Sequence, residues 1–157
     1  MDYPQILAPI YSFLHCKTPD TWLDKARLPE NLPLLLTDHL VCELKAAQTA
    51  MFLVRKYVAG KDGAQALLDW LKPYEAFAFR EGEAPDFALL NKQINKSVMP
   101  KTDDPWGLML IESMVLLIKE ELHHFWQVWE AMQRRNIPYV KITASRYAKG
   151  MLKEVRT

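Results

Sequence analysis

The stretch Glu120-Glu121-Leu122-His123-His124 lies near the middle of a long window in which apolar residues recur at helical spacing. Asp104 followed by Pro105 is typical of a helix start, because the aspartate can cap the first turn and a proline there loses no needed donor. Asn136-Ile137-Pro138 is typical of a helix end. The window therefore predicts one long helix over residues 105–136.

A second long helix is predicted over residues 33–59. Asn31 can cap this helix, Pro33 suits its first turn, and Gly60 is placed to end it. No segment alternates apolar and polar residues like a strand for more than a few residues, and the chain has only 5 glycines. These patterns predict an all-α fold class.

The remaining segments are predicted to surround these two helices. Residues 1–32 are rich in proline and predict an irregular arm that wraps a bundle, with one short helical piece at 21–26. Residues 64–101 predict an insertion that opens with an amphipathic helix over 64–79. Residues 139–157 predict a basic tail. We expect all 157 residues to form a single domain that is incomplete at its C-terminal end.

The composition limits the kinds of partner that the chain can attract. Hydrophobic residues make up 50% of the sequence, which is enough for a core of ordinary size. Lys and Arg number 20 against 19 Asp and Glu, so the net charge of +1 gives no general attraction for a polyanion. Any surface that binds nucleic acid must therefore be local.

The sequence predicts a cytoplasmic protein that does not enter a membrane. The first residues lack the basic and apolar regions of a secretory signal. The longest apolar run, Leu108 to Ile118, is far shorter than the roughly 20 residues of a membrane helix. We expect Cys16 and Cys42 to be reduced thiols, since two distant cysteines do not make a disulfide framework.

Each predicted long helix carries an apolar stripe that is interrupted by polar residues. In the first helix the stripe consists of Leu36, Leu40, Glu43, Ala47, Ala50 and Val54. In the second helix it consists of Leu110, Met114, Leu117, Glu121, His124, Val128 and Ala131. Three polar side chains, Glu43, Glu121 and His124, therefore occupy predicted core positions.

Two buried carboxylates and an imidazole on facing helices would be strongly unfavourable without a cation between them. Glu121 and His124 are three residues apart, so they project from one face and can share a metal ion with Glu43 from the facing helix. A complete di-iron site uses one Glu from each of two helices and Glu-x-x-His from each of the other two. The pattern thus predicts half of a di-iron site in a ferritin-like helical bundle, with no catalytic residue beyond the metal ligands.

Other interpretations of these residues remain open. Glu120 and His123 form a rival pair, but they share the more polar face of the helix, so we expect them to support the ligands or to lie at the surface. A buried Glu43 could instead pair with Lys45 or Arg55, although neither lies on its stripe.

Several further residues are more simply explained by packing. We expect His15 and His39 to be ordinary, partly buried histidines, and Cys42 to be a small packing residue. We also expect the aromatic residues of the second helix to pack rather than to stack on bases; they are Trp106, Phe125, Trp126 and Trp129.

Three stretches of the sequence resemble the MiaE family of bacterial tRNA hydroxylases. The first runs from Asp38 to Ala47, and the second is Glu120-Glu-Leu-His-His-Phe125 with Gln127-Val128. The third is Ser145-Arg-Tyr-Ala-Lys-Gly150 before Val155-Arg-Thr157. The sequence departs from the family at Trp126, where the family pattern has an acidic residue. Family members continue past the third stretch into two further helices, so the resemblance covers only the first part of the family.

The resemblance implies a ferritin-like four-helix bundle with a non-haem di-iron centre. It implies a monooxygenase that uses O2 to hydroxylate the isopentenyl group of 2-methylthio-isopentenyl-adenosine, next to the anticodon of tRNA. It assigns Glu43, Glu121 and His124 as iron ligands, in agreement with the stripe argument. Such a reaction needs an external electron donor or reductase, and the second set of ligands would come from the further helices or from a homodimer.

Two other classes of function remain open: a ferritin-like protein that binds or oxidises iron, and an incomplete half-domain that acts as a helical interaction module. If the partner is tRNA, phosphate contacts are expected from basic residues near the C-terminal end. These residues are Lys141, Arg146, Lys149, Lys153 and Arg156.

Overall fold

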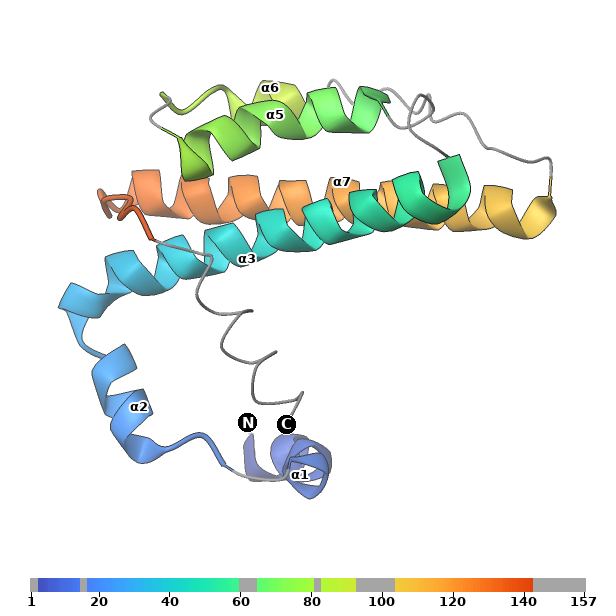
Figure 1. Cartoon of the computed structure of the whole chain (residues 1–157). Helices are drawn as coiled ribbons and strands as arrows, with labels where there is room; N and C mark the ends of the chain where they lie inside the picture. Colours follow the sequence, from blue (N-terminus) through green and yellow to red (C-terminus); the bar gives the residue numbers. More distant parts are fainter. Residues whose placement is uncertain (1–2, 15–16, 60–64, 81–82, 93–103, 143–157) are drawn as a thin grey trace, which may run out of the picture. The chain divides into compact units, whose positions relative to one another are not determined.

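The structure, a computed structural model, describes residues 3–14, 17–59, 65–80, 83–92 and 104–142. Every regular element in these ranges is helical (Figure 1), as the all-α prediction requires. None of these helices is long and apolar enough to cross a membrane. The chain divides into two compact units, residues 1–32 and 33–157, and the boundary coincides with the end of the predicted arm.

The N-terminal unit is more regular than its prolines predict. Helix α2 spans Asp20–Ala26, in agreement with the predicted helical piece, and a 3-10 turn, η1, spans Pro29–Asn31. Helix α1 spans Tyr3–Phe13, so the prediction of an irregular segment is wrong there. Pro4 lies in the first turn of α1, where no backbone donor is needed, and Pro9 removes one donor without ending the helix.

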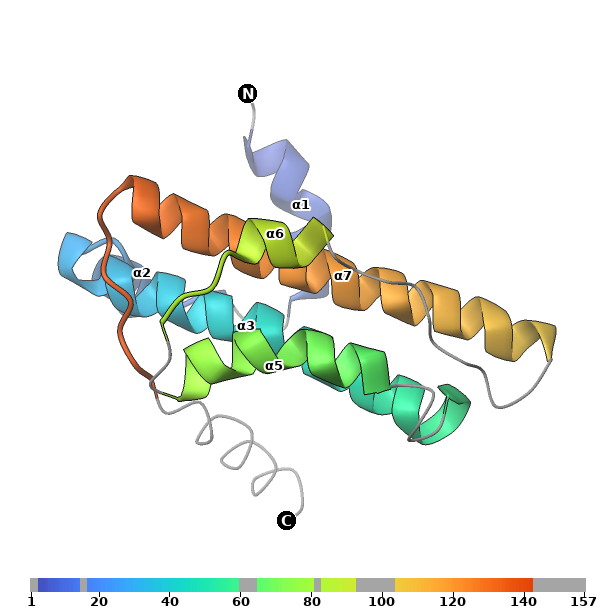
Figure 2. The ribbon, with the colours of Figure 1, turned by 90° about the horizontal axis from the view of Figure 1, so that it is seen from above.

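Two long antiparallel helices lie side by side in the second unit (Figures 1 and 2). Helix α3 spans Leu32–Leu53 and continues as a π-helix, η2, over Val54–Ala59. Helix α7 spans Pro105–Arg134, and the Asp104 carboxylate accepts a hydrogen bond from the Gly107 N–H at 3.0 Å. Both predicted helices and the predicted cap at Asp104 are thus confirmed, whereas the Asn31 side chain donates to the Lys25 carbonyl.

The segment predicted to be an insertion contributes to the core. Helix α5 spans Gln65–Phe79 and α6 spans Phe87–Lys92, and both lie on one side of the α3 and α7 pair (Figure 1). The rings of Tyr74 and Phe87 pack against Phe125 of α7, with centroid distances of 5.3 and 5.0 Å. Phe77 joins the same cluster. We define these four residues as the aromatic cluster.

The buried stripe of α7 is displaced by one residue from the predicted stripe, because the displaced set is wholly apolar and packs against the aromatic cluster. The buried residues of α7 are Ile111, Val115, Ile118, Leu122, Phe125 and Met132. Leu110, on the predicted stripe, is 43% exposed. Because α5 and α6 supply large rings, the face of α7 that carries Phe125 turns inward, and the Glu121 face lies at its edge. In α3 the apolar prediction holds, since Leu40, Ala47, Ala50 and Val54 are buried.

Hydrogen bonds anchor the chain after α7 to α3 and α5. Asn136 ends the helix with a left-handed backbone conformation, at φ 53°. The Tyr139 hydroxyl donates to the Ala78 carbonyl at 3.0 Å, and the Val140 N–H donates to the Thr37 hydroxyl at 3.1 Å. The predicted basic tail therefore begins with two anchored residues.

Phe125→Ala should lower the free energy of unfolding by about 3–5 kcal/mol, because it removes a fully buried ring from the aromatic cluster. Trp106→Ala is the matched control on the same helix, since Trp106 is 75% exposed and its loss should change stability by about 0.5 kcal/mol or less. Chemical denaturation of both variants measures the difference. Equal losses would contradict the core described above.

Candidate metal centre

Three predicted ligands meet at the seam between α3 and α7. Glu43 comes from α3, and Glu121 and His124 come from adjacent turns of α7. One ligand atom from each residue lies within 4.8 Å of the other two. The His124 Nδ1 lies 3.6 Å from Glu43 Oε2 and 3.8 Å from Glu121 Oε2. A single cation between these atoms would contact all three side chains.

The three side chains are less buried than core positions would be. The exposed fraction is 15% for the Glu43 side chain and 19% for Glu121, but 52% for His124. The prediction that His124 occupies a core position is therefore wrong, because the aromatic cluster turns the adjacent face of α7 inward instead. The carboxylates lie half-buried at the helix seam, and the imidazole is open on one side.

The two carboxylates lie close enough for their negative charges to repel each other. A hydrogen bond shared with Glu43 is the main reason that the pKa of Glu121 is raised, and burial and the negative charge of Glu43 raise it further. His124 opposes this increase. A metal ion between these side chains would instead stabilise both carboxylates in their charged form.

His39 is a neighbour of the site that the sequence analysis did not identify. Its Nε2 lies 3.3 Å from Glu43 Oε1, so the Glu43 carboxylate has one histidine at each oxygen. The His39 side chain is 57% exposed, rather than partly buried as predicted. The spacing of four residues between His39 and Glu43 was the available signal, since such residues are neighbours on a helix.

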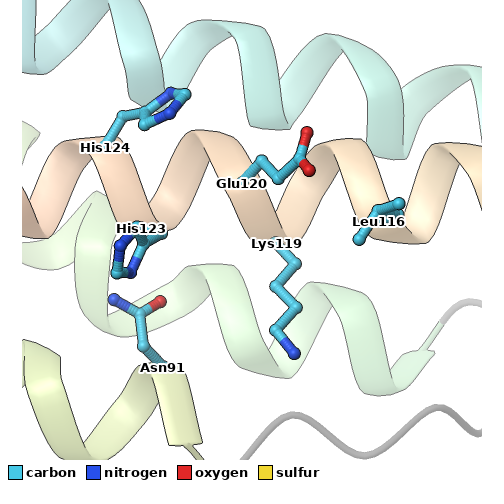
Figure 3. Close-up of a pocket in the computed structure, with 6 residues that line it drawn as sticks. All are labelled: Asn91, Leu116, Lys119, Glu120, His123 and His124. Carbon is cyan, nitrogen blue, oxygen red and sulfur yellow. The ribbon is translucent and has the colours of Figure 1, made fainter.

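Glu120 and His123 do not belong to this group of ligands. They line an open pocket of 280 Å³ together with Asn91, Leu116, Lys119 and His124. Figure 3 shows that His123 points toward Asn91, whereas His124 points to the other side of α7, toward α3. The ring of His123 lies near that of Trp126, with centroids 5.2 Å apart.

The structure also places the residues that were expected only to pack. Phe125 is buried and Trp126 and Trp129 are partly buried, but Trp106 is exposed. Cys42 is a free, exposed thiol, so the prediction that it packs in the core is wrong.

Several predicted residues lie outside the part of the chain that the structure describes. His15 and Cys16 lie outside the described residues, and of the five basic residues proposed to contact tRNA only Lys141 lies within them. Lys141 is exposed. The others, Arg146, Lys149, Lys153 and Arg156, lie outside the described residues.

Two carboxylates and one imidazole are a donor set that suits ferrous iron. They correspond to one Glu and one Glu-x-x-His, which is half of the ligands in a di-iron carboxylate site. The fold and this donor set together define a helical-bundle protein with a candidate carboxylate–histidine metal centre.

The chain belongs to the MiaE family, described as tRNA-(MS[2]IO[6]A)-hydroxylase, whose pattern matches residues 5–157. This match confirms the resemblance drawn from the three sequence stretches. A protein of Salmonella typhimurium named tRNA 2-(methylsulfanyl)-N(6)-isopentenyladenosine(37) hydroxylase is 76% identical over 157 residues. A protein of Pseudomonas putida with the same name is 30% identical over 151 residues. No solved structure gives a significant match.

Both relatives are considerably longer than this chain. The alignment covers 100% of the chain but 58% of the Salmonella protein. It covers 96% of the chain and 50% of the Pseudomonas protein. The chain thus spans little more than half the length of these relatives.

The raised pKa of Glu121 predicts how the stability of the metal-free protein depends on pH. Because the pKa of Glu121 is higher in the folded state, the folded state keeps its proton after the unfolded state has lost it. The free energy of unfolding should therefore fall as pH rises from the ordinary Glu value of 4.5 through the raised one. Glu121→Gln should remove this contribution, which denaturation across that pH range measures. Parallel curves for the two proteins would contradict it.

Proposed function

We propose that this chain provides iron ligands for a tRNA hydroxylase that acts on the isopentenyl group of 2-methylthio-isopentenyl-adenosine. The observation that carries the proposal is the meeting of Glu43, Glu121 and His124 within 4.8 Å, in a chain of the MiaE family. The names of the two relatives support the choice of substrate. Because tRNA is a cytoplasmic substrate, the proposed function is a cytoplasmic one.

The chain's own residues would hold the metal rather than react with the substrate. When bound, iron would supply the activation of O2 that hydroxylation of an unactivated carbon requires, with electrons from an external donor or reductase. Glu43 would bind from α3, and Glu121 and His124 from α7, so the pairing of these helices fixes the distance between ligands. Carboxylates suit this role because they are hard anionic ligands.

A pair of iron ions needs a second set of donors. We propose that these donors come either from a further segment like the one that makes the relatives longer, or from a second copy of this chain in a homodimer. In the homodimer Glu43, Glu121 and His124 would each be present twice about a two-fold axis. Iron content and molecular mass measured on the same sample distinguish these arrangements.

The proposed iron site is tested by anaerobic Fe2+ titration of the protein. His124→Ala should weaken Fe2+ binding by at least about 10-fold, because it removes one of three donors. His123→Ala is the matched control, since His123 is the adjacent histidine but lies outside the ligand group. Equal affinities of the two variants would refute the ligand assignment.

The proposed activity is tested with tRNA that carries the prenylated base, O2 and a chemical reductant, with the hydroxylated nucleoside measured after digestion. Product that is lost in Glu43→Ala and kept in His123→Ala would support the hydroxylase. Uptake and oxidation of iron that proceed without product would instead favour the ferritin-like alternative. If the protein binds no iron, the remaining candidate function is the helical interaction module.

We also propose that the basic residues beyond α7 contact tRNA phosphates. Reversing two of these charges, with Arg146→Glu and Lys149→Glu, should weaken tRNA binding several-fold at low salt and reduce its salt dependence. Reversing the charges of Lys25 and Lys92 changes the net charge equally and serves as the control. Filter binding at several salt concentrations measures both, and equal losses in the two proteins would argue against a local tRNA surface.

A further inference from the structure

Two hydrogen bonds connect α5 to α7 through α6. The Tyr74 hydroxyl of α5 donates to Asn91 Oδ1 at 3.1 Å. Asn91 Nδ2, in α6, donates to the main-chain carbonyl of Leu122 at 3.3 Å. We define these two side chains as the Tyr74–Asn91 pair. They join segments that lie 17 and 31 residues apart in the sequence.

The acceptor of this connection lies in the turn of α7 that carries the candidate ligands. Leu122 follows Glu121 directly and precedes His124 by two residues. In a helix the backbone is rigid over one turn, so holding one carbonyl holds the rotation and the axial position of its neighbours. A rotation of about 10° would move an atom at the helix surface by about 1 Å, which is enough to spoil metal coordination.

The chemistry of Asn91 defines the direction of the connection. The Leu122 carbonyl can only accept a hydrogen bond, so the NH2 group of Asn91 must face it, and the amide oxygen is left to accept from Tyr74. An aspartate would repel the carbonyl, and a leucine would make neither bond. The site therefore uses both the donor and the acceptor of an amide.

Tyr74 holds this connection from within the core. Its side chain is completely buried in the aromatic cluster, and burial raises the pKa of its phenol further above neutral, so the hydroxyl is protonated and can donate. A phenylalanine would fill the same space without a polar atom that needs a partner. A buried hydroxyl here has no packing advantage, but it does orient Asn91.

We propose that Tyr74 and Asn91 are positioning residues for the candidate metal centre. They fix the ligand-bearing turn of α7 from the α6 side, where Asn91 lines the pocket beside His123 (Figure 3), while Glu43 approaches from α3. The distance between the carboxylates then depends on both sides of α7. This role rests on the proposed function, because it requires that Glu121 and His124 bind a metal.

The test compares Asn91→Leu and Tyr74→Phe with the control Tyr139→Phe in Co2+ titrations. Tyr139 also donates from a partly buried hydroxyl to a partner 61 residues away, but to the Ala78 carbonyl of α5 and not to α7. Co2+ is the probe because its visible absorption reports coordination geometry. Asn91→Leu should weaken Co2+ binding about 10-fold and alter the absorption, Tyr74→Phe should shift both in the same direction, and Tyr139→Phe should change neither.

A second measurement needs no metal. The 1H–15N signals of the His124 imidazole in the metal-free protein should shift in Asn91→Leu and Tyr74→Phe but not in Tyr139→Phe. If Asn91→Leu does not fold, Tyr74→Phe decides the question, since it keeps every carbon atom of the core.

Three outcomes would overturn the proposal. Unchanged Co2+ affinity and His124 signals in both variants would leave the metal centre intact and refute the positioning role alone. Equal changes in all three variants would assign the effect to general stability. A wild-type protein that binds neither Co2+ nor Fe2+ would refute the proposed metal centre and the positioning role with it.

Discussion

The proximity of the Glu43 and Glu121 carboxylates is the constraint on which the site depends. Each comes from a different helix, so their separation is set by how α3 packs against α7. The negative charge of Glu43 raises the pKa of Glu121, and His124 opposes that increase. The packing of the helices thus favours positive charge between these carboxylates, where His39 and His124 lie among the described residues.

Much of the helical framework could be predicted because its signals are local. The cap at Asp104, the proline after it and the apolar spacing of α3 and α7 act over a few residues, and the structure follows them. The ligand pattern could also be proposed locally, since Glu121 and His124 share one face of one helix. The regular helix α1 contradicts the local signal, because a single proline inside a helix removes only one backbone donor.

What failed to be predicted depends on contacts between distant segments. The buried residues of α7 form an apolar stripe in the sequence itself, but the rings of Tyr74, Phe77 and Phe87 that cover it come from distant segments. Asn91 joins Leu122 across 31 residues, and a lone Asn in a short helix carries no sequence signal for such a contact. Treating residues 64–101 as an insertion therefore hid the partner that orients α7.

The aromatic cluster and the candidate metal centre are consequences of the same rotation of α7. Turning Phe125 inward places Glu121 and His124 at the edge of the core. Each directly precedes a buried residue, and successive residues of a helix are about 100° apart. At that edge the carboxylates are sheltered enough to interact strongly, yet the imidazole keeps an open side. A fully exposed pair of carboxylates would lose most of its charge interaction to water, so the partial burial at this edge preserves that interaction. The partly buried position of the candidate site therefore follows from how α5 and α6 complete the core.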